Sequence, residues 1–188
     1  MKETLKSLVE GCPVIAAIKD EAGLEKCLKT DIGIVFVLYG DICSIAGIVD
    51  RLKESGKTAM VHIDLISGLG TKEIAVDYIR ERTKADGIIS TKPALIKRGA
   101  ELGMYTIQRY FVLDSMAVEN ISRQAEAHNP NLIEILPGAM PKVIKRIAGI
   151  ISTPVIAGGL ISDREDVLAA LNAGAVAVST SNTDVWEL

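Results

Sequence analysis

The chain has 188 residues, of which 48% are hydrophobic and 24% are charged, enough to build one buried core in a single domain spanning residues 1–188. Its net charge of -3 argues against a basic surface for nonspecific nucleic-acid binding, although it is compatible with a local basic patch. No apolar run approaches the length of a membrane span, and the first residues lead into no signal-peptide core. We therefore expect a cytoplasmic protein without a membrane contact.

Apolar, β-branched runs alternate with amphipathic segments along the chain, a pattern that predicts parallel strand-helix-strand units. The predicted strands are 14–19, 32–39, 58–64, 87–91, 104–110, 132–136, 155–157 and 175–180. The predicted helices are 21–29, 42–55, 71–83, 93–102, 115–128, 141–150 and 163–173. Pro93 and Pro141 near first turns, with Gly103 and Gly174 just past helix ends, are typical of helix boundaries.

Eight strands in this alternation predict an α/β fold, a compact (β/α)8 barrel of the TIM type in one domain, with a shortened last unit. The chain is short for such a barrel, which typically has about 200 to 250 residues, so its helices and loops must be trimmed. An open, doubly wound sheet is the main alternative. The two final strand-helix units favour the closed barrel, because their loops resemble phosphate-binding loops.

One of these loops begins with a glycine pair, and the other with a run of small polar residues. In barrels, the loops after strands seven and eight commonly hold a phosphate against backbone N–H groups and the N-terminus of a short helix. A glycine pair after a strand can also be only a turn. We predict that phosphate is bound by Gly158, Gly159, Ser179, Thr180, Ser181 and Asn182.

Polar residues near the carboxyl ends of the other strands are expected to line the barrel mouth. They are Lys19, His62, Asp64, Lys92, Arg109 and Glu134. His62 and Asp64 are two apart and should share a face of their strand, although a buried core histidine is an alternative. A lone carboxylate such as Glu134 in a buried strand costs several kcal/mol unless it is paired, hydrogen-bonded or metal-bound. Lys19, Lys92 or Arg109 could pair with Glu134, or one of these cations could instead bind the phosphate.

The three cysteines, Cys12, Cys27 and Cys43, are odd in number and lack paired spacing. They indicate neither a disulfide framework nor a zinc site, and we expect buried free thiols. No motif predicts a cofactor or a metal, and a metal near Asp64 and Glu134 is left open.

Six ordered segments together resemble the glycerol uptake operon antiterminator regulatory proteins, which are glycerol-3-phosphate-responsive antiterminators. They are VHIDLISGL (61–69), KADGIISTK (84–92), IQRYFVLDS (107–115), IEILPGAMPKVI (133–144), IAGGLI (156–161) and AVSTSNTDVW (177–186). The resemblance covers nearly the whole chain. It implies a non-catalytic transcriptional regulator that binds glycerol 3-phosphate and acts on the leader RNA of glycerol-utilisation genes to prevent termination.

Two other functions are compatible with the same residues. A small-phosphate barrel enzyme, such as an aldolase, isomerase or lyase, could use His62, Asp64, Lys92 and Glu134 in acid–base or Schiff-base chemistry. The fold cannot decide between them, because this barrel hosts many chemistries. A ligand-binding protein without RNA contact is the third alternative.

The sequence carries no RNP-like aromatic pair and no arginine-rich tail, so an RNA surface must be sought among small basic clusters. The candidates are Lys84, Lys97, Arg98, Lys142, Lys145 and Arg146. Lys142 and Arg146 are four apart and would share a helix face, although such clusters are usually only solvated surface. A homodimer could join two small patches into one footprint.

Overall fold

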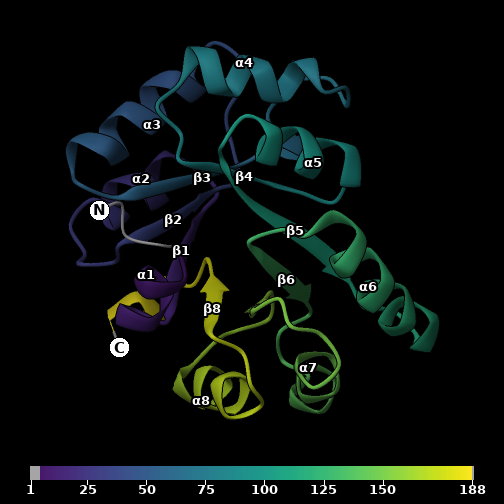
Figure 1. Ribbon diagram of the computed structural model, residues 1–188. Helices are drawn as coiled ribbons and strands as arrows, with labels where there is room; N and C mark the ends of the chain where they lie inside the picture. Colours follow the sequence, from purple (N-terminus) through teal and green to yellow (C-terminus); the bar gives the residue numbers. More distant parts are fainter. Residues whose placement is uncertain (1–4, 188) are drawn as a thin grey trace.

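The computed structural model describes residues 5–187, and within them eight parallel strands close into a barrel ringed by helices (Figure 1). The strands follow one another around the barrel in sequence order, and β8 pairs with β1 to close it. The predicted (β/α)8 barrel is therefore confirmed, and the sheet is not the open alternative. None of the helices in the described chain is long and apolar enough to span a membrane.

The strands are close to the predicted segments, although most are shorter. They are β1 (Val14–Ile18), β2 (Ile34–Val37), β3 (Thr58–His62), β4 (Gly87–Ser90), β5 (Tyr105–Phe111), β6 (Leu132–Leu136), β7 (Val155–Gly158) and β8 (Ala177–Thr180). The difference matters at β3, which ends at His62. The chain then turns into the 3-10 helix η1 (Ile63–Leu65), so Asp64 lies outside the strand.

The seven predicted helices are all present, each starting and ending within a few residues of its predicted bounds. They are α2 (Glu21–Cys27), α3 (Ile45–Glu54), α4 (Ile74–Arg82), α5 (Pro93–Glu101), α6 (Ser115–His128), α7 (Pro141–Ala148) and α8 (Arg164–Asn172). Asp20, Asp114 and Asp163 cap three of them by accepting a bond from a first-turn N–H. After β8 the described chain contains only the short 3-10 helix η2 (Val185–Glu187), as expected for a shortened last unit.

A further helix, α1 (Leu5–Gly11), precedes β1 and was not predicted. Its Leu5 and Val9 are four residues apart, share one helix face, and are buried against the apolar residues inside the barrel. Leu8 lies beside the residues that precede β3, β4 and β5. Helix α1 therefore covers the amino end of the barrel.

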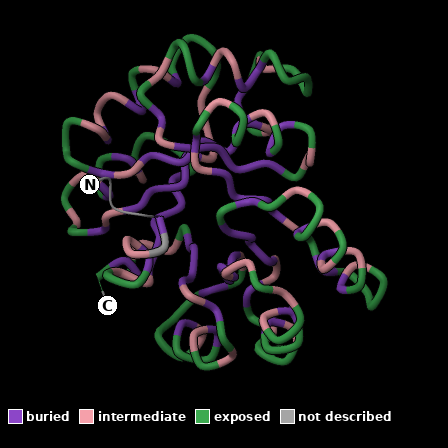
Figure 2. Tube along the Cα trace, viewed as in Figure 1, coloured by how far each residue is buried: buried purple, intermediate pink, exposed green. Residues whose placement is uncertain are grey.

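The strands are buried along most of their length (Figure 2), and their side chains form two apolar layers, one inside the barrel and one beneath the helices. Inward-pointing residues such as Phe36, Met60 and Ile107 fill the barrel, while their neighbours pack against the helices. At Gly87, a Cβ would meet Met60 Cε at 2.5 Å and overlap the Tyr105 carbonyl, so only glycine fits there. The tight interior fixes where each strand ends, and hence where its last side chain lies.

The three cysteines are free thiols, but only Cys27 is buried as expected. Cys12 is half-buried, and Cys43 is exposed. The prediction for Cys43 is wrong because this residue lies in the turn between β2 and α3, where its N–H donates to the Asp41 side chain, and not on a buried element face.

His62 occupies the carboxyl end of β3 and is 3% exposed. Burial, followed by the nearby positive charge of Arg109, lowers the pKa of His62 from 6.5 to about 4. The imidazole is therefore neutral at neutral pH. Its Nδ1 has no hydrogen-bond partner in the described chain.

We expect this shift to make the protein acid-sensitive. Between pH 6.5 and pH 4 the unfolded chain binds a proton at His62 that the folded chain does not, so the free energy of unfolding falls as the pH falls, by about 3 kcal/mol. Urea unfolding at a series of pH values should show that His62→Gln flattens this dependence. Met60→Leu, which is also inside the barrel but does not titrate, should shift stability equally at every pH. A His62→Gln variant with the parent's slope would contradict the assignment.

Candidate ligand site at the carboxyl end of the barrel

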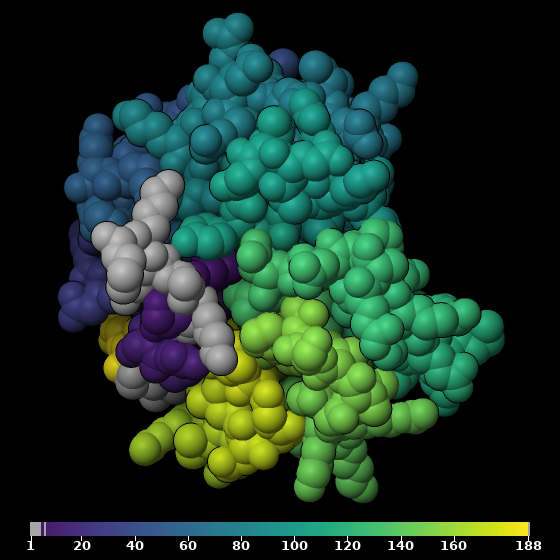
Figure 3. Space-filling view, viewed as in Figure 1, coloured from purple at the N-terminus to yellow at the C-terminus, as the bar shows by residue number. Residues whose placement is uncertain are grey.

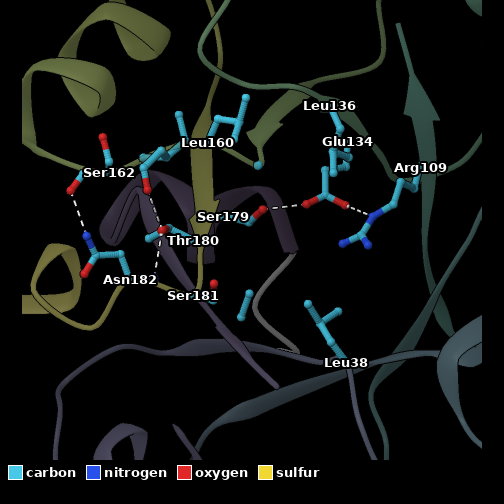
Figure 4. A pocket seen from close by; sticks show the side chains of 13 residues that line it. Leu38, Arg109, Glu134, Leu136, Leu160, Ser162, Ser179, Thr180, Ser181 and Asn182 are labelled. Atoms are coloured by element: carbon cyan, nitrogen blue, oxygen red, sulfur yellow. Dashed lines mark hydrogen bonds and ion pairs between the residues drawn. The ribbon is translucent and has the colours of Figure 1, made fainter. Parts of the chain in front are cut away.

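A buried ion pair lies inside the carboxyl end of the barrel. Glu134 on β6 is fully buried, and Arg109 on the adjacent β5 is 8% exposed. Arg109 Nε donates to Glu134 Oε2 at 2.5 Å, and the Ser179 hydroxyl on β8 donates to Glu134 Oε1 (Figure 4). Of the three cations considered as partners of Glu134, the structure selects Arg109. The carboxylate is therefore paired and hydrogen-bonded, as its burial requires.

Gly158, the last residue of β7, makes room for this arrangement. A Cβ at this position would overlap Glu134 Oε1 and would lie 2.6 Å from Ser179 Oγ. The absence of a side chain at Gly158 thus allows the carboxylate to sit between β7 and β8. This is a packing role for Gly158, and the phosphate contact of this residue stays a prediction.

A cavity of about 290 Å³ opens beside the ion pair. Arg109 and Glu134 line one side, and the loops after β7 and β8 line the other (Figure 4). Leu38 and Leu136, at the ends of β2 and β6, add apolar walls. A small ligand with one charged end and one partly apolar body fits such a space.

Side-chain bonds tie the two loops together. Thr180 Oγ1 donates to the carbonyl of Ile161 at 2.8 Å, and Asn182 Nδ2 donates to the carbonyl of Ser162 at 2.8 Å. The Asn182 N–H in turn donates to Thr180 Oγ1 at 3.0 Å. Thr180 and Asn182 therefore hold the loops in place, and Ser179 holds Glu134, so these three predicted phosphate residues already have partners.

The backbone of the same loops has unused donors. The N–H groups of Gly159, Leu160 and Ser181 donate to no residue in the described chain. Gly159 has φ +73° and Leu160 has φ +58°, the left-handed region in which a leucine is strained by about 1–2 kcal/mol. Strain of this kind often marks a binding loop. Gly159 and Ser181 are thus the predicted phosphate residues whose N–H groups are still available at the cavity.

The N-terminus of α8 is not available to an anion. Asp163 accepts the N–H of Asp166 at 2.9 Å, and Asp166 Oδ2 accepts both the N–H and the hydroxyl of Ser162. The hydrogen bonds from Ser162 lower the pKa of Asp166. Two carboxylates therefore occupy the N-terminal end of α8, and the available N–H donors lie earlier, in the loop.

Asp64 and Lys92 form a separate pair between β3 and α5. The carboxylate of Asp64 accepts from the Ser90 hydroxyl, from the N–H and hydroxyl of Thr91, and from Lys92 Nζ at 3.4 Å. Burial acts to raise the pKa of Asp64, but the bonds from Thr91 and Ser90 and the charge of Lys92 outweigh it, and the pKa is lowered. Because Asp64 follows the strand, it does not share a strand face with His62, contrary to expectation.

The two other predicted mouth residues lie near the cavity without lining it. Lys19 borders a neighbouring hollow of about 230 Å³ that shares Ala17 and Ser181 with the main cavity. His62 is buried, and it lies close enough to Arg109 for that positive charge to lower its pKa. Within residues 5–187, no group of three His, Cys, Asp or Glu side chains could hold a metal ion.

The apolar and loop residues that line the cavity were missed by sequence reasoning. They are Ala17, Leu38, Leu136, Leu160, Ile161 and Ser162. Leu38 and Leu136 are apolar residues within apolar runs, so the sequence does not distinguish them from core residues. Only the strand register identifies them as cavity-lining. Leu160 could have been found only from its backbone conformation.

The basic clusters differ in how far they are neutralised. Arg98 pairs with Asp77 and Glu101, and Lys84 pairs with Asp50. The three basic side chains of α7 are exposed and form no ion pair with a described residue; they are Lys142, Lys145 and Arg146. Lys97 on α5 is also exposed without an ion-pair partner in this part of the chain.

Comparison with known proteins shows close relatives of the whole chain. A curated relative, the uncharacterized protein YgcP of Escherichia coli, is 46% identical over 184 residues, which cover 98% of this chain and 96% of that protein. The crystal structure of a glycerol uptake operon antiterminator regulatory protein from Listeria monocytogenes has 33% identity and a TM-score of 0.90, covering 94% of this chain and 95% of the other. A glycerol uptake operon antiterminator-related protein from Thermotoga maritima has 34% identity and a TM-score of 0.83, covering 93% and 98%.

More distant barrels share the fold alone. The deoxyribose phosphate aldolase of Aeropyrum pernix has a TM-score of 0.71 but only 14% identity, covering 98% of this chain and 91% of that one. The family described as "Glycerol-3-phosphate responsive antiterminator" matches residues 14–186, which include every element of the barrel. This chain therefore belongs to the glycerol-3-phosphate responsive antiterminator family.

Proposed function

We propose that the protein binds glycerol 3-phosphate in the cavity beside the Arg109–Glu134 pair and, with that ligand bound, acts as an antiterminator on the leader RNA of glycerol-utilisation genes. The cavity carries this proposal, because it offers unused cationic and N–H donors beside a buried carboxylate. The family and its solved relatives support the regulatory part.

The phosphate is proposed to lie between Arg109 and the two loops. In the described chain Arg109 donates only through Nε, so its terminal amino groups remain for an anion (Figure 4). A guanidinium can bind phosphate with two parallel hydrogen bonds. The N–H groups of Gly159, Leu160 and Ser181 would complete the site from the other side.

The glycerol hydroxyls are proposed to meet the ion pair and its neighbours. Each oxygen of Glu134 accepts one bond within the protein, and each retains a second lone pair for a ligand hydroxyl. Leu38 and Leu136 would pack against the carbon chain of the polyol. Inorganic phosphate cannot make these contacts, so the polar end should set selectivity.

A binding role is favoured over catalysis. Lys92, a candidate Schiff-base lysine, is paired with Asp64 and does not line the cavity. His62 is buried with a pKa of about 4, which makes it a weak base at neutral pH. Glu134 is already held by Arg109 and Ser179. The proposed sensor therefore has a ligand site in which the candidate acid–base groups are buried or paired.

Gly159→Asp is expected to weaken glycerol 3-phosphate binding by about a hundredfold or more, because a carboxylate beside the loop N–H groups repels the phosphate. Titration calorimetry measures the loss. Gly103→Asp is the matched control: its φ of +68° imposes similar backbone strain, and a Cβ there meets nothing within 4 Å. Parent-like affinity in Gly159→Asp would rule out the phosphate assignment.

Glu134→Gln should reduce selectivity for the polyol. Removing the charge leaves Arg109 uncompensated, which favours any anion, while the ligand hydroxyls lose a charged acceptor. We expect a lower ratio of glycerol 3-phosphate to inorganic phosphate affinity in calorimetry, with a stability loss of about 3 kcal/mol. Asp64→Asn, outside the cavity, should leave the ratio unchanged. A constant ratio in Glu134→Gln would make this residue purely structural.

If the protein is a regulator of this kind, its binding of ligand and its binding of RNA should be thermodynamically coupled. Glycerol 3-phosphate should strengthen leader-RNA binding by about 1 to 3 kcal/mol, and RNA must strengthen ligand binding by the same factor. Fluorescence anisotropy and calorimetry measure the two arms, and Gly159→Asp should abolish the coupling. NMR of the ligand should show no turnover. Equal RNA affinity with and without ligand, together with conversion of the ligand to product, would favour the enzyme instead.

A further inference from the structure

Helix α7 carries an uncompensated positive charge. Between Glu134 and Asp163 the sequence contains Lys142, Lys145 and Arg146 but no Asp or Glu. All three cations are exposed, and none forms an ion pair with a described residue. Figure 3 shows side chains of this segment projecting into solvent at the lower edge of the molecule. The protein is acidic as a whole, so the surface of α7 departs from the average.

A groove lies beside this helix, where α6 packs against α7. It has a volume of about 390 Å³. Val118, Met140 and Val143 give it apolar walls, and Lys142 and Arg146 border it on the α7 side. Leu113 borders it as well and is 88% exposed.

One acidic residue, Asp114, borders the same groove. Its side chain accepts the N–H of Ala117 at 2.8 Å as the N-cap of α6, so one lone-pair direction is already used. The border of the groove thus carries this one carboxylate and the two cations Lys142 and Arg146. The groove therefore combines apolar walls with a net positive border, which suits a partner that is both anionic and partly apolar.

We propose that this groove binds a single-stranded segment of RNA, with phosphates on Lys142 and Arg146 and unpaired bases against the apolar walls. Single strands expose their base faces for such contacts, while their backbone requires cations. The lack of acidic residues on α7 favours this polyanion over an acidic-and-basic protein surface. The assignment rests on the proposed RNA-dependent function and adds the place where the RNA binds.

Gly138, between β6 and α7, links the groove to the ligand cavity by hydrogen bonds. Its N–H donates to the carbonyls of both Gly158 and Gly159, at 2.6 and 2.9 Å. A Cβ on Gly138 would lie 2.9 Å from the backbone of Ala157 and Gly158, so only glycine allows this contact. Met140, two residues later, already borders the groove. A ligand that orders the Gly159 loop would therefore also restrain the segment that leads into α7, which gives the coupling a structural path.

The test compares two double variants of equal charge change, with a fluorescent transcript of a glycerol-operon leader as the probe and saturating glycerol 3-phosphate. Lys142→Ala/Arg146→Ala should weaken RNA binding by about tenfold and lower the slope of log affinity against log salt by about 1.4, since each lost phosphate contact removes about 0.7. The control, Lys29→Ala/Arg82→Ala, also removes one lysine and one arginine, both exposed, from the turn after α2 and from the end of α4, and it should change RNA affinity less than about twofold. Both should retain the parent's ligand affinity.

The outcomes separate this inference from the function on which it rests. If the parent binds the leader but both double variants bind it equally, the α7 assignment is wrong and the proposed function stands. If the parent does not bind the leader with ligand present, both the α7 assignment and the proposed function are wrong. Leu113→Ser tests the remaining occupant, a second copy of the chain. A change from dimer to monomer in light scattering, with unchanged RNA affinity, would assign the groove to self-association and overturn the RNA contact.

Discussion

One buried carboxylate, Glu134, constrains the whole carboxyl end of the barrel. Its charge has no contact with water, so it must be compensated within the protein, and Arg109 and Ser179 do this from two different strands. Gly158 leaves the space into which the carboxylate fits. Removing one partner of such a pair is costly because the other charge stays buried, and β5, β6, β7 and β8 are therefore held in a fixed arrangement. The cavity has one rigid wall before any ligand arrives.

The opposite wall is built differently. Bonds from Thr180 and Asn182 join the loops after β7 and β8, so the loops form one connected unit, while several of their backbone N–H groups have no partner in the described chain. A rigid wall that contains the Arg109–Glu134 pair faces a connected but strained loop pair, and this arrangement suits the proposed sensor, because a ligand could stabilise one loop arrangement without rebuilding the barrel. Through Gly138 the end of β7 and the loop after it contact the segment between β6 and α7.

The fold was predictable because each strand-helix unit repeats the same alternation of apolar and amphipathic segments. Glu134 was predictable for the opposite reason, since a carboxylate in Leu-Ile-Glu-Ile-Leu breaks the pattern. Its partner required the register, in which Arg109 pairs directly with Glu134. Asp64 was misplaced because β3 ends earlier than its apolar run suggests. Helix α1 was missed because seven residues are too few for a clear period, and its stability comes from packing against the barrel.

The close approach of Glu134 to Gly158 also concerns how this sequence can change over evolutionary time. A side chain at position 158 collides with the carboxylate, so any larger residue there is admissible only after position 134 has become smaller. A smaller residue at 134 would in turn leave the Arg109 charge buried and unpaired. Positions 109, 134 and 158 can therefore not drift independently. Where related chains differ at one of them, they should differ at the others, and such correlated changes would identify lineages in which this end of the barrel has been rebuilt.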